Sequence, residues 1–185
     1  MIIRRLWFAI LLLLTWCSIL AQGDSSVYFF LSDIPSRGIL LNKDWKFHSG
    51  DDMQWAQTGF HDADWISVDS SDEWHHLPEV RKSNIGWFRL NLKVDSALLG
   101  KTFAFIVSTF GASEIYFNGK IIYRFGIVSD DFHKELTRYY SNRLLSLKLG
   151  EKPEQTITIR HSFNKKNLYL KFTNARPIAR ITLVS

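Results

Sequence analysis

Cysteine, proline and glycine are all scarce, since the 185 residues include only one, four and ten of them, respectively. A single cysteine excludes a disulfide-stabilised miniprotein. The low glycine and proline content excludes collagen-like and low-complexity chains. Hydrophobic residues make up 46% of the sequence and charged residues 22%, which excludes an intrinsically disordered chain. The sequence therefore encodes a folded protein of a length that fits one domain.

The first 21 residues have the pattern of a secretory signal peptide. Arg4 and Arg5 precede an apolar run over 6–20, and the small residue Ala21 follows it. This run is short for a bilayer span. We predict cleavage after Ala21 and export to the periplasm or the cell exterior, with membrane anchoring as the alternative if the segment is not cleaved. Cleavage also removes Cys17, so no disulfide, thiol nucleophile or cysteine-bound metal is expected.

The charge of the remaining chain is uneven. Residues 24–95 carry 12 acidic and 7 basic side chains, whereas residues 96–185 carry 6 acidic and 14 basic ones. A nucleic-acid-binding protein needs a contiguous basic face, but here single Lys and Arg residues alternate with apolar ones. Nucleic acid is therefore not an expected partner, and the basic half suits an anionic membrane surface or an acidic partner instead.

The second half of the chain alternates between apolar and polar residues, which indicates β-strands. Over 87–94 this alternation places Phe88 and Leu90 on one face and Trp87 and Arg89 on the other. The denser apolar run 101–110 is expected to be buried on both sides.

Asn118 and Gly119 lie between two β-rich runs, 114–117 and 120–124. This pair is typical of a two-residue hairpin turn, in which both residues adopt positive φ. The sequence therefore predicts a hairpin at this point.

The number and spacing of the predicted strands indicate a β-sandwich. Further strands are predicted at 39–41, 45–48, 143–149, 155–163, 168–172 and 178–184, with one short helix within 52–58. These strands, of which 39–41 and 45–48 count as one or two additions, indicate an all-β, two-sheet jelly-roll sandwich of about eight or nine strands. The expected organisation is a signal peptide (1–21), an N-terminal extension (22–37) and the sandwich (38–185).

Two long connections, 70–85 and 126–142, are the expected place for a binding site, because long loops on a rigid scaffold commonly carry function. Sugar recognition needs an aromatic surface for the ring face and planar polar groups for the hydroxyls. The candidate ligand-binding residues are Trp74, His76 and Glu79 in the first connection, Tyr139 and Tyr140 in the second, and Arg89 and Arg124 on strands.

Metal binding is not expected. Asp62 and Asp64 lack the spacing of a dedicated calcium loop, and a turn or helix-cap role is favoured for them. His75 and His76 are adjacent, and adjacent side chains on a strand point apart. His161 lies on an apolar strand face and is predicted to be a hydrogen-bonded core histidine. No cofactor is predicted either.

Four segments carry a resemblance: 41–47 (LNKDWKF), 60–65 (FHDADW), 86–89 (GWFR) and 112–120 (ASEIYFNGK). Together they resemble the galactose-binding-like jelly roll that forms the N-terminal sugar-binding domain of family two glycoside hydrolases. Segments 86–126 and 158–162 are also similar to the exported N-terminal domain of bacterial membrane sensor proteins. Those proteins include seven-transmembrane receptors with diverse intracellular signalling modules. The resemblance covers about residues 38–165.

The resemblance implies packing roles for Trp45, Trp65 and Trp87 and turn roles for Asn118 and Gly119. It implies no catalytic residue, because the hydrolases carry their catalytic carboxylates in a separate barrel domain. In the sensor proteins, membrane helices follow the sandwich, whereas this sequence ends soon after it. The resemblance therefore leaves a free periplasmic domain and a truncated signalling protein as alternatives.

Three functions follow from these observations. The preferred one is a non-catalytic periplasmic recognition or sensor domain for a carbohydrate or another small polar ligand, with an envelope or membrane signalling protein as partner. The second is a structural or protein-interaction sandwich without a small ligand. The third is a carbohydrate-active enzyme, for which Glu79 with Glu114 or Asp131 would be the only acid–base pairs.

Overall fold

The computed structural model describes residues 27–70, 78–162 and 179–185, apart from the side chains of residues 80, 81, 139 and 140. The described residues form ten strands, joined by turns and short 3-10 helices, and the predicted all-β sandwich is confirmed. No helix in this part of the chain is long and apolar enough to cross a membrane. The strands are β1 (Tyr28–Leu31), β2 (Ile39–Leu40), β3 (Trp45–Ser49), β4 (Ile66–Val68), β5 (Ile85–Val94), β6 (Thr102–Phe117), β7 (Lys120–Phe125), β8 (Arg138–Lys148), β9 (Glu154–Ser162) and β10 (Ala179–Val184).

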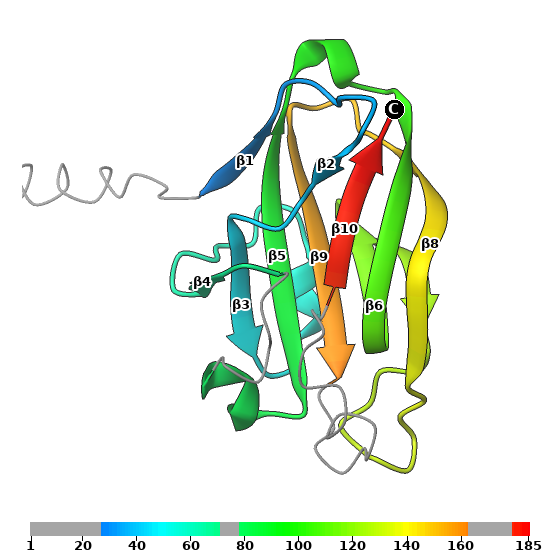
Figure 1. Ribbon diagram of the computed structural model, residues 1–185. Helices are drawn as coiled ribbons and strands as arrows, with labels where there is room; N and C mark the ends of the chain where they lie inside the picture. The colour runs from blue at the N-terminus through cyan, green and yellow to red at the C-terminus, as the bar shows by residue number, and fades with distance from the viewer. Residues whose placement is uncertain (1–26, 71–77, 163–178) are drawn as a thin grey trace, which may run out of the picture.

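The strands form two sheets that share β6 (Figure 1). Sheet A has the order β4-β3-β5-β9-β6-β7, and β1 pairs in parallel with residues 91–94 of β5. Sheet B has the order β2-β10-β6-β8. All pairs except β1–β5 are antiparallel.

The strand β6 passes from one sheet to the other at Gly111. Residues 102–111 pair with β8 in sheet B, and residues 112–117 pair with β9 in sheet A. Gly111 has a φ of 109°, and a Cβ atom there would lie 2.8 Å from His161 Cε1. Glycine is therefore required where the strand changes sheets.

The main core lies between the two sheets. It contains Phe88 and Leu90 on β5 and Ile157 and Ile159 on β9, as the alternation predicts. The prediction that 101–110 is buried on both sides is wrong for most of the run. Alternate residues such as Phe105 enter the core, whereas Ala104, Ile106 and Ser108 face outward and are only half-buried.

A second core lies on the outer face of sheet A, where the segment 51–65 crosses the strands. This covering segment contains the 3-10 helix η2 (Met53–Ala56) in place of the predicted helix within 52–58. Its Trp55 and Trp65 rings meet edge to face at 5.4 Å and pack with Trp87 and Tyr116. Both faces of the first half of β5 are therefore buried.

Two strands, β1 and β4, were not predicted, and β8 begins earlier than predicted. The strand β1 lies in the expected N-terminal extension (22–37), and Leu31 and Ile34 are part of the main core, so the folded unit begins before residue 38. The strand β8 begins at Arg138, so the second long connection ends at residue 137 and not at 142. The predicted strand 168–172 lies outside the described residues.

Candidate functional site

One row of side chains crosses the outer face of sheet A from β3 to β7. Directly opposed residues of an antiparallel pair share a face, and the strand registers therefore align five of them. In order, the row is His48 on β3, Trp87 on β5, Arg160 on β9, Glu114 on β6 and Arg124 on β7.

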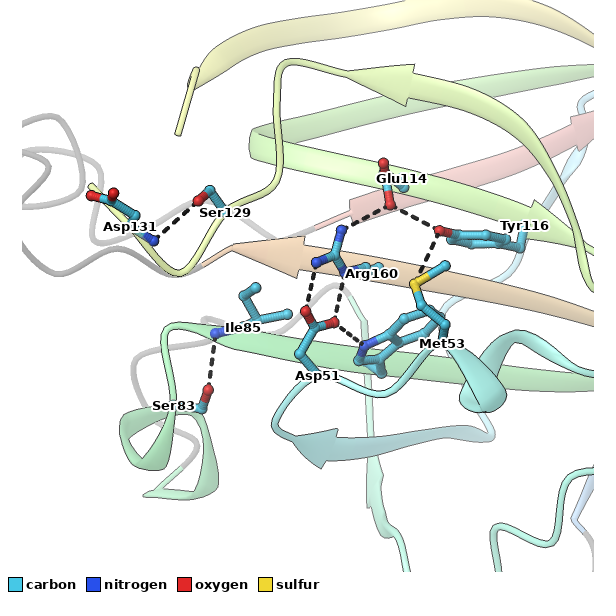
Figure 2. Close-up of polar contacts among 10 residues, drawn as sticks. Asp51, Met53, Ser83, Ile85, Glu114, Tyr116, Ser129, Asp131 and Arg160 are labelled. Atoms are coloured by element: carbon cyan, nitrogen blue, oxygen red, sulfur yellow. Dashed lines mark hydrogen bonds and ion pairs between the residues drawn. The ribbon is translucent and has the colours of Figure 1, made fainter. Parts of the chain in front are cut away.

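Arg160 lies in the middle of this row and binds two carboxylates, one from the covering segment and one from the row, as Figure 2 shows. Its Nε and Nη2 atoms donate to Asp51 at 2.7 and 2.6 Å, and its Nη1 atom donates to Glu114 at 3.1 Å. Tyr116 donates to the same Glu114 oxygen at 2.8 Å. The pair Arg160–Asp51 thus fastens the start of the covering segment to the sheet.

This cluster keeps Asp51 and Arg160 charged and keeps Tyr116 in its neutral, protonated form. Burial opposes ionisation of Asp51, but hydrogen bonds from Arg160 and Trp87 outweigh it, and the pKa of Asp51 is lowered. The hydrogen bond with Asp51 is the main reason that the pKa of Arg160 is raised. Burial, aided by Glu114, raises the pKa of Tyr116.

A second arginine, Arg89, fastens the other end of the covering segment. Its Nε atom donates to Asp62 Oδ2 at 3.0 Å, and both side chains are 1% exposed. Its Nη1 atom donates to the carbonyl oxygens of Trp55 at 2.6 Å and Gln57 at 3.1 Å. Burial is the main cause of a lowered pKa for Arg89, and Asp62 opposes it.

A groove with a volume of about 500 Å³ opens beside Arg89. It lies over Arg89 and Asn91 of β5 and over the start of β9, between residues 58–61 of the covering segment and the loop 150–152. The residues that line it are Tyr28, Thr58, Gly59, Phe60, His61, Arg89, Asn91, Asn118, Gly150, Glu151, Lys152, Glu154, Gln155 and Thr156.

The groove combines aromatic and polar side chains. Tyr28 and Phe60 are half-buried, and Phe60 lies over the Arg89 guanidinium at 5.5 Å. The amide side chains of Asn91 and Asn118 also line the groove. A pocket of a few hundred Å³ with apolar walls and a few fixed polar groups is the usual form of a small-ligand site.

The predicted ligand-binding residues are only partly brought together. Arg89 lines the groove, while Arg124 is in the Arg160 row, where its Nε atom lies 3.4 Å from Glu114. Glu79 is in the 3-10 helix η4 (Pro78–Lys82) and forms an ion pair with Lys82. Trp74 and His76, like His75, lie outside the described residues. Tyr139 and Tyr140 are on β8 and not on a loop, and their side chains are outside the described part.

The residues predicted to be structural lie in cores and turns. Trp45 is fully buried and donates to the Leu41 carbonyl oxygen, and Trp65 and Trp87 belong to the second core. Asn118 and Gly119 form the hairpin turn with φ values of 49° and 78°. Asp62 begins a turn, since its carbonyl oxygen accepts from the Trp65 backbone N–H at 3.1 Å, but its side chain binds Arg89 and does not cap the turn.

His161 is buried, and its Nδ1 atom lies 2.7 Å from the Ser113 hydroxyl oxygen, as predicted for a core histidine. Burial lowers its pKa to about 3. The carboxylates considered for acid–base catalysis each have a cation nearby, since Glu79 pairs with Lys82, Glu114 with Arg160, and Asp131 with Lys134.

The groove residues Tyr28, Phe60, Asn91, Glu151 and Glu154 were missed by the sequence interpretation. One feature of the sequence could have predicted the groove. Asn91 follows Arg89 by two residues and therefore lies on the same strand face. Two polar side chains on a face that also carries Trp87 indicate a covered polar site.

Comparisons with known proteins show that this fold also occurs in glycoside hydrolases. No protein-family model matches the chain. A β-galactosidase of Bacteroides ovatus, BoGH2A, is 33% identical over 114 residues, which cover 54% of this chain and 13% of that enzyme. The crystal structure of a Bacteroides uniformis β-glucuronidase matches with a TM-score of 0.54 and 17% identity, over 79% of this chain and 18% of that one. A glycosyl hydrolase family 2 member from Bacteroides cellulosilyticus matches with a TM-score of 0.54 and 15% identity, over 80% of this chain and 20% of that one.

The chain shares its fold with one domain of family 2 glycoside hydrolases. It spans about an eighth to a fifth of the length of these relatives. The similarity therefore shows a shared β-sandwich fold and is limited to one part of each enzyme.

Proposed function

We propose that this protein is an exported, non-catalytic carbohydrate-recognition domain whose ligand binds in the groove beside Arg89. The main observation in support is the groove itself, which places the aromatic side chains of Tyr28 and Phe60 around the polar groups of Arg89, Asn91 and Asn118. Aromatic faces and planar hydrogen-bonding groups are what a sugar ring requires. The match to part of a β-galactosidase supports a carbohydrate as the ligand.

In this proposal the protein works at the bacterial cell envelope. The signal-peptide pattern of residues 1–21 supports export. The resemblance to exported domains of membrane sensor proteins supports a sensing role, in which sugar binding is reported to an envelope signalling protein.

A thermal-shift screen of the purified protein against neutral and acidic mono- and oligosaccharides tests the proposal. A ligand at 100 times its dissociation constant stabilises a fold by about 2.7 kcal/mol, which for a domain of this size is a shift of roughly 5–10 °C. We expect Tyr28→Ala to abolish the shift. Phe30→Ala is the matched control, because Phe30 is on the same strand, is 72% exposed and does not line the groove. A stable sample that responds to no saccharide would contradict the proposal.

The outer face of sheet B favours a second candidate, a protein-interaction sandwich. Strand registers align Leu40, Thr182, Ile106 and Leu144 in one row across this face, and Leu144 is 65% exposed. The other three side chains are half-buried, and a mostly apolar row with an exposed leucine favours a contact surface. Co-purification that Leu144→Lys abolishes, together with a flat saccharide screen, would support this candidate over the first.

A further inference from the structure

We infer that the groove recognises the carboxylate of an acidic sugar, a uronic acid, through a floor of N–H donors. This inference rests on the proposed carbohydrate-binding function and specifies the chemical class of the ligand. It depends on which atoms of Arg89, Asn91 and Asn118 already have hydrogen-bond partners within the protein.

The two amide side chains have fixed orientations. Asn91 Nδ2 donates to the Asp62 carboxylate at 3.0 Å, so its Oδ1 atom faces the Thr156 hydroxyl at 3.2 Å. Asn118 Oδ1 accepts from the Thr156 backbone N–H at 2.9 Å. Because a carboxylate only accepts and a backbone N–H only donates, neither amide can be flipped. Both amide oxygens are thus already bonded.

The unused hydrogen-bonding capacity of these side chains lies on nitrogen. Asn118 Nδ2 and Arg89 Nη2 have no hydrogen-bond partner among the described residues, and Asn91 Nδ2 has one hydrogen left over. Arg89 is 1% exposed yet lines the groove. Three groove-lining side chains therefore have N–H groups to spare. Both amide oxygens are occupied and a guanidinium has no acceptor, so a bound group has to supply oxygens that accept hydrogen bonds.

The charges at the rim favour an anion over a neutral hydroxyl. Glu154 lies 3.1 Å from Lys93, and Glu151 lies 3.9 Å from Lys148, so each rim carboxylate has a cation nearby. The charge of Arg89 is balanced by Asp62. Lys152 also lines the groove, and no ion pair involves it among the described residues. One positive charge thus remains. A carboxylate accepts several N–H bonds at once, and bonds to an ionised acceptor are about twice as strong as neutral ones.

The test compares galacturonic acid with its methyl ester, which has the same ring without the charge, by isothermal titration calorimetry. Galactose and acetate complete the panel, since acetate carries a carboxylate without a sugar. We expect the acid to bind at least tenfold more tightly than its ester or galactose, and acetate to bind weakly.

Asn118→Asp is the diagnostic variant. It keeps the oxygen that accepts from Thr156 and is tolerated at positive φ, but it replaces the N–H donors with a negative oxygen. We expect at least a tenfold loss of affinity for the acid and little change for the ester. Asn84→Asp is the matched control, because Asn84 binds the Asp130 carbonyl oxygen outside the groove. Lys152→Gln, at an exposed position, is a second variant and should weaken acid binding by a few fold.

Equal affinity for acid and ester, or no effect of Asn118→Asp in a folded sample, would overturn the inference. Binding of neutral sugars alone would overturn it while leaving the proposed function intact. No binding of any saccharide would reject both.

Discussion

Two aspartate–arginine pairs fasten the same covering segment to the same sheet, yet they lie in different surroundings. Asp62 and Arg89 are both 1% exposed, whereas the side chains of Asp51 and Arg160 are 36% and 15% exposed. In the buried pair the pKa of arginine is lowered, and in the open pair it is raised. Removing the aspartate should therefore lower the unfolding free energy by different amounts in the two pairs. Desolvation dominates the Asp62–Arg89 pair, whereas direct hydrogen bonding dominates the Asp51–Arg160 pair.

The largest effect is expected for Asp62→Ala. This change leaves the Arg89 charge buried without its carboxylate, which typically costs about 3–5 kcal/mol. Chemical denaturation measures the loss in free energy of unfolding. Asp64→Ala is the matched control two residues away, and its exposed side chain should matter by about 0.5 kcal/mol or less. Similar values for the two variants would contradict the distinction between the pairs.

A smaller effect is expected for Asp51→Ala, about 1 kcal/mol at neutral pH, because the pair is partly solvated. The folded pKa of Asp51 is lowered, so its stabilising contribution is present above the unfolded pKa of about 3.9. The contribution is lost as the pH falls through the folded value. The unfolding free energies of wild type and Asp51→Ala should therefore converge as the pH falls below the unfolded pKa of about 3.9. A difference that grows on acidification would rule out this account.

The smallest effect is expected for Arg124→Ala. Arg124 is 64% exposed and lies 3.4 Å from Glu114, and such surface pairs contribute roughly 0–1 kcal/mol. We expect a change in unfolding free energy of about 0.5 kcal/mol or less. The unfolding free energies of Arg124→Ala and Asp51→Ala are compared at low and high salt. A loss for Arg124→Ala as large as that for Asp51→Ala would show that the Arg160 cluster depends on Arg124.

The features that the sequence predicts best are local. The hairpin at Asn118 and Gly119 follows from the conformational requirements of two adjacent residues, and the inward face of β5 follows from its alternation. The burial of Arg89 could not be predicted in this way. It depends on residues 55–62, which are about 30 positions earlier in the chain and form no regular strand.

The start of β8 was misplaced for a similar reason. Its first residues, Arg138 to Asn142, do not alternate, and the register with β6 shifts between Val107 and Thr109. Asn142 adopts a φ of 51° at this irregularity. A bulge disturbs the period of two on which the strand prediction depends, so a strand segment was interpreted as a loop.

The position of β10 has a consequence for how the chain folds. This strand inserts between β2 and β6, and its Ile181 and Leu183 are fully buried. The strands β2 and β6, which come earlier in the chain, are thus held together by residues near position 180. The strands β3, β4 and β5 can pair with one another, and β6 with β8, before residues 179–184 are in place, but β2 joins sheet B only through β10. Because such distant contacts slow folding, we expect the insertion of β10 between β2 and β6 to be a late step in completing the sandwich.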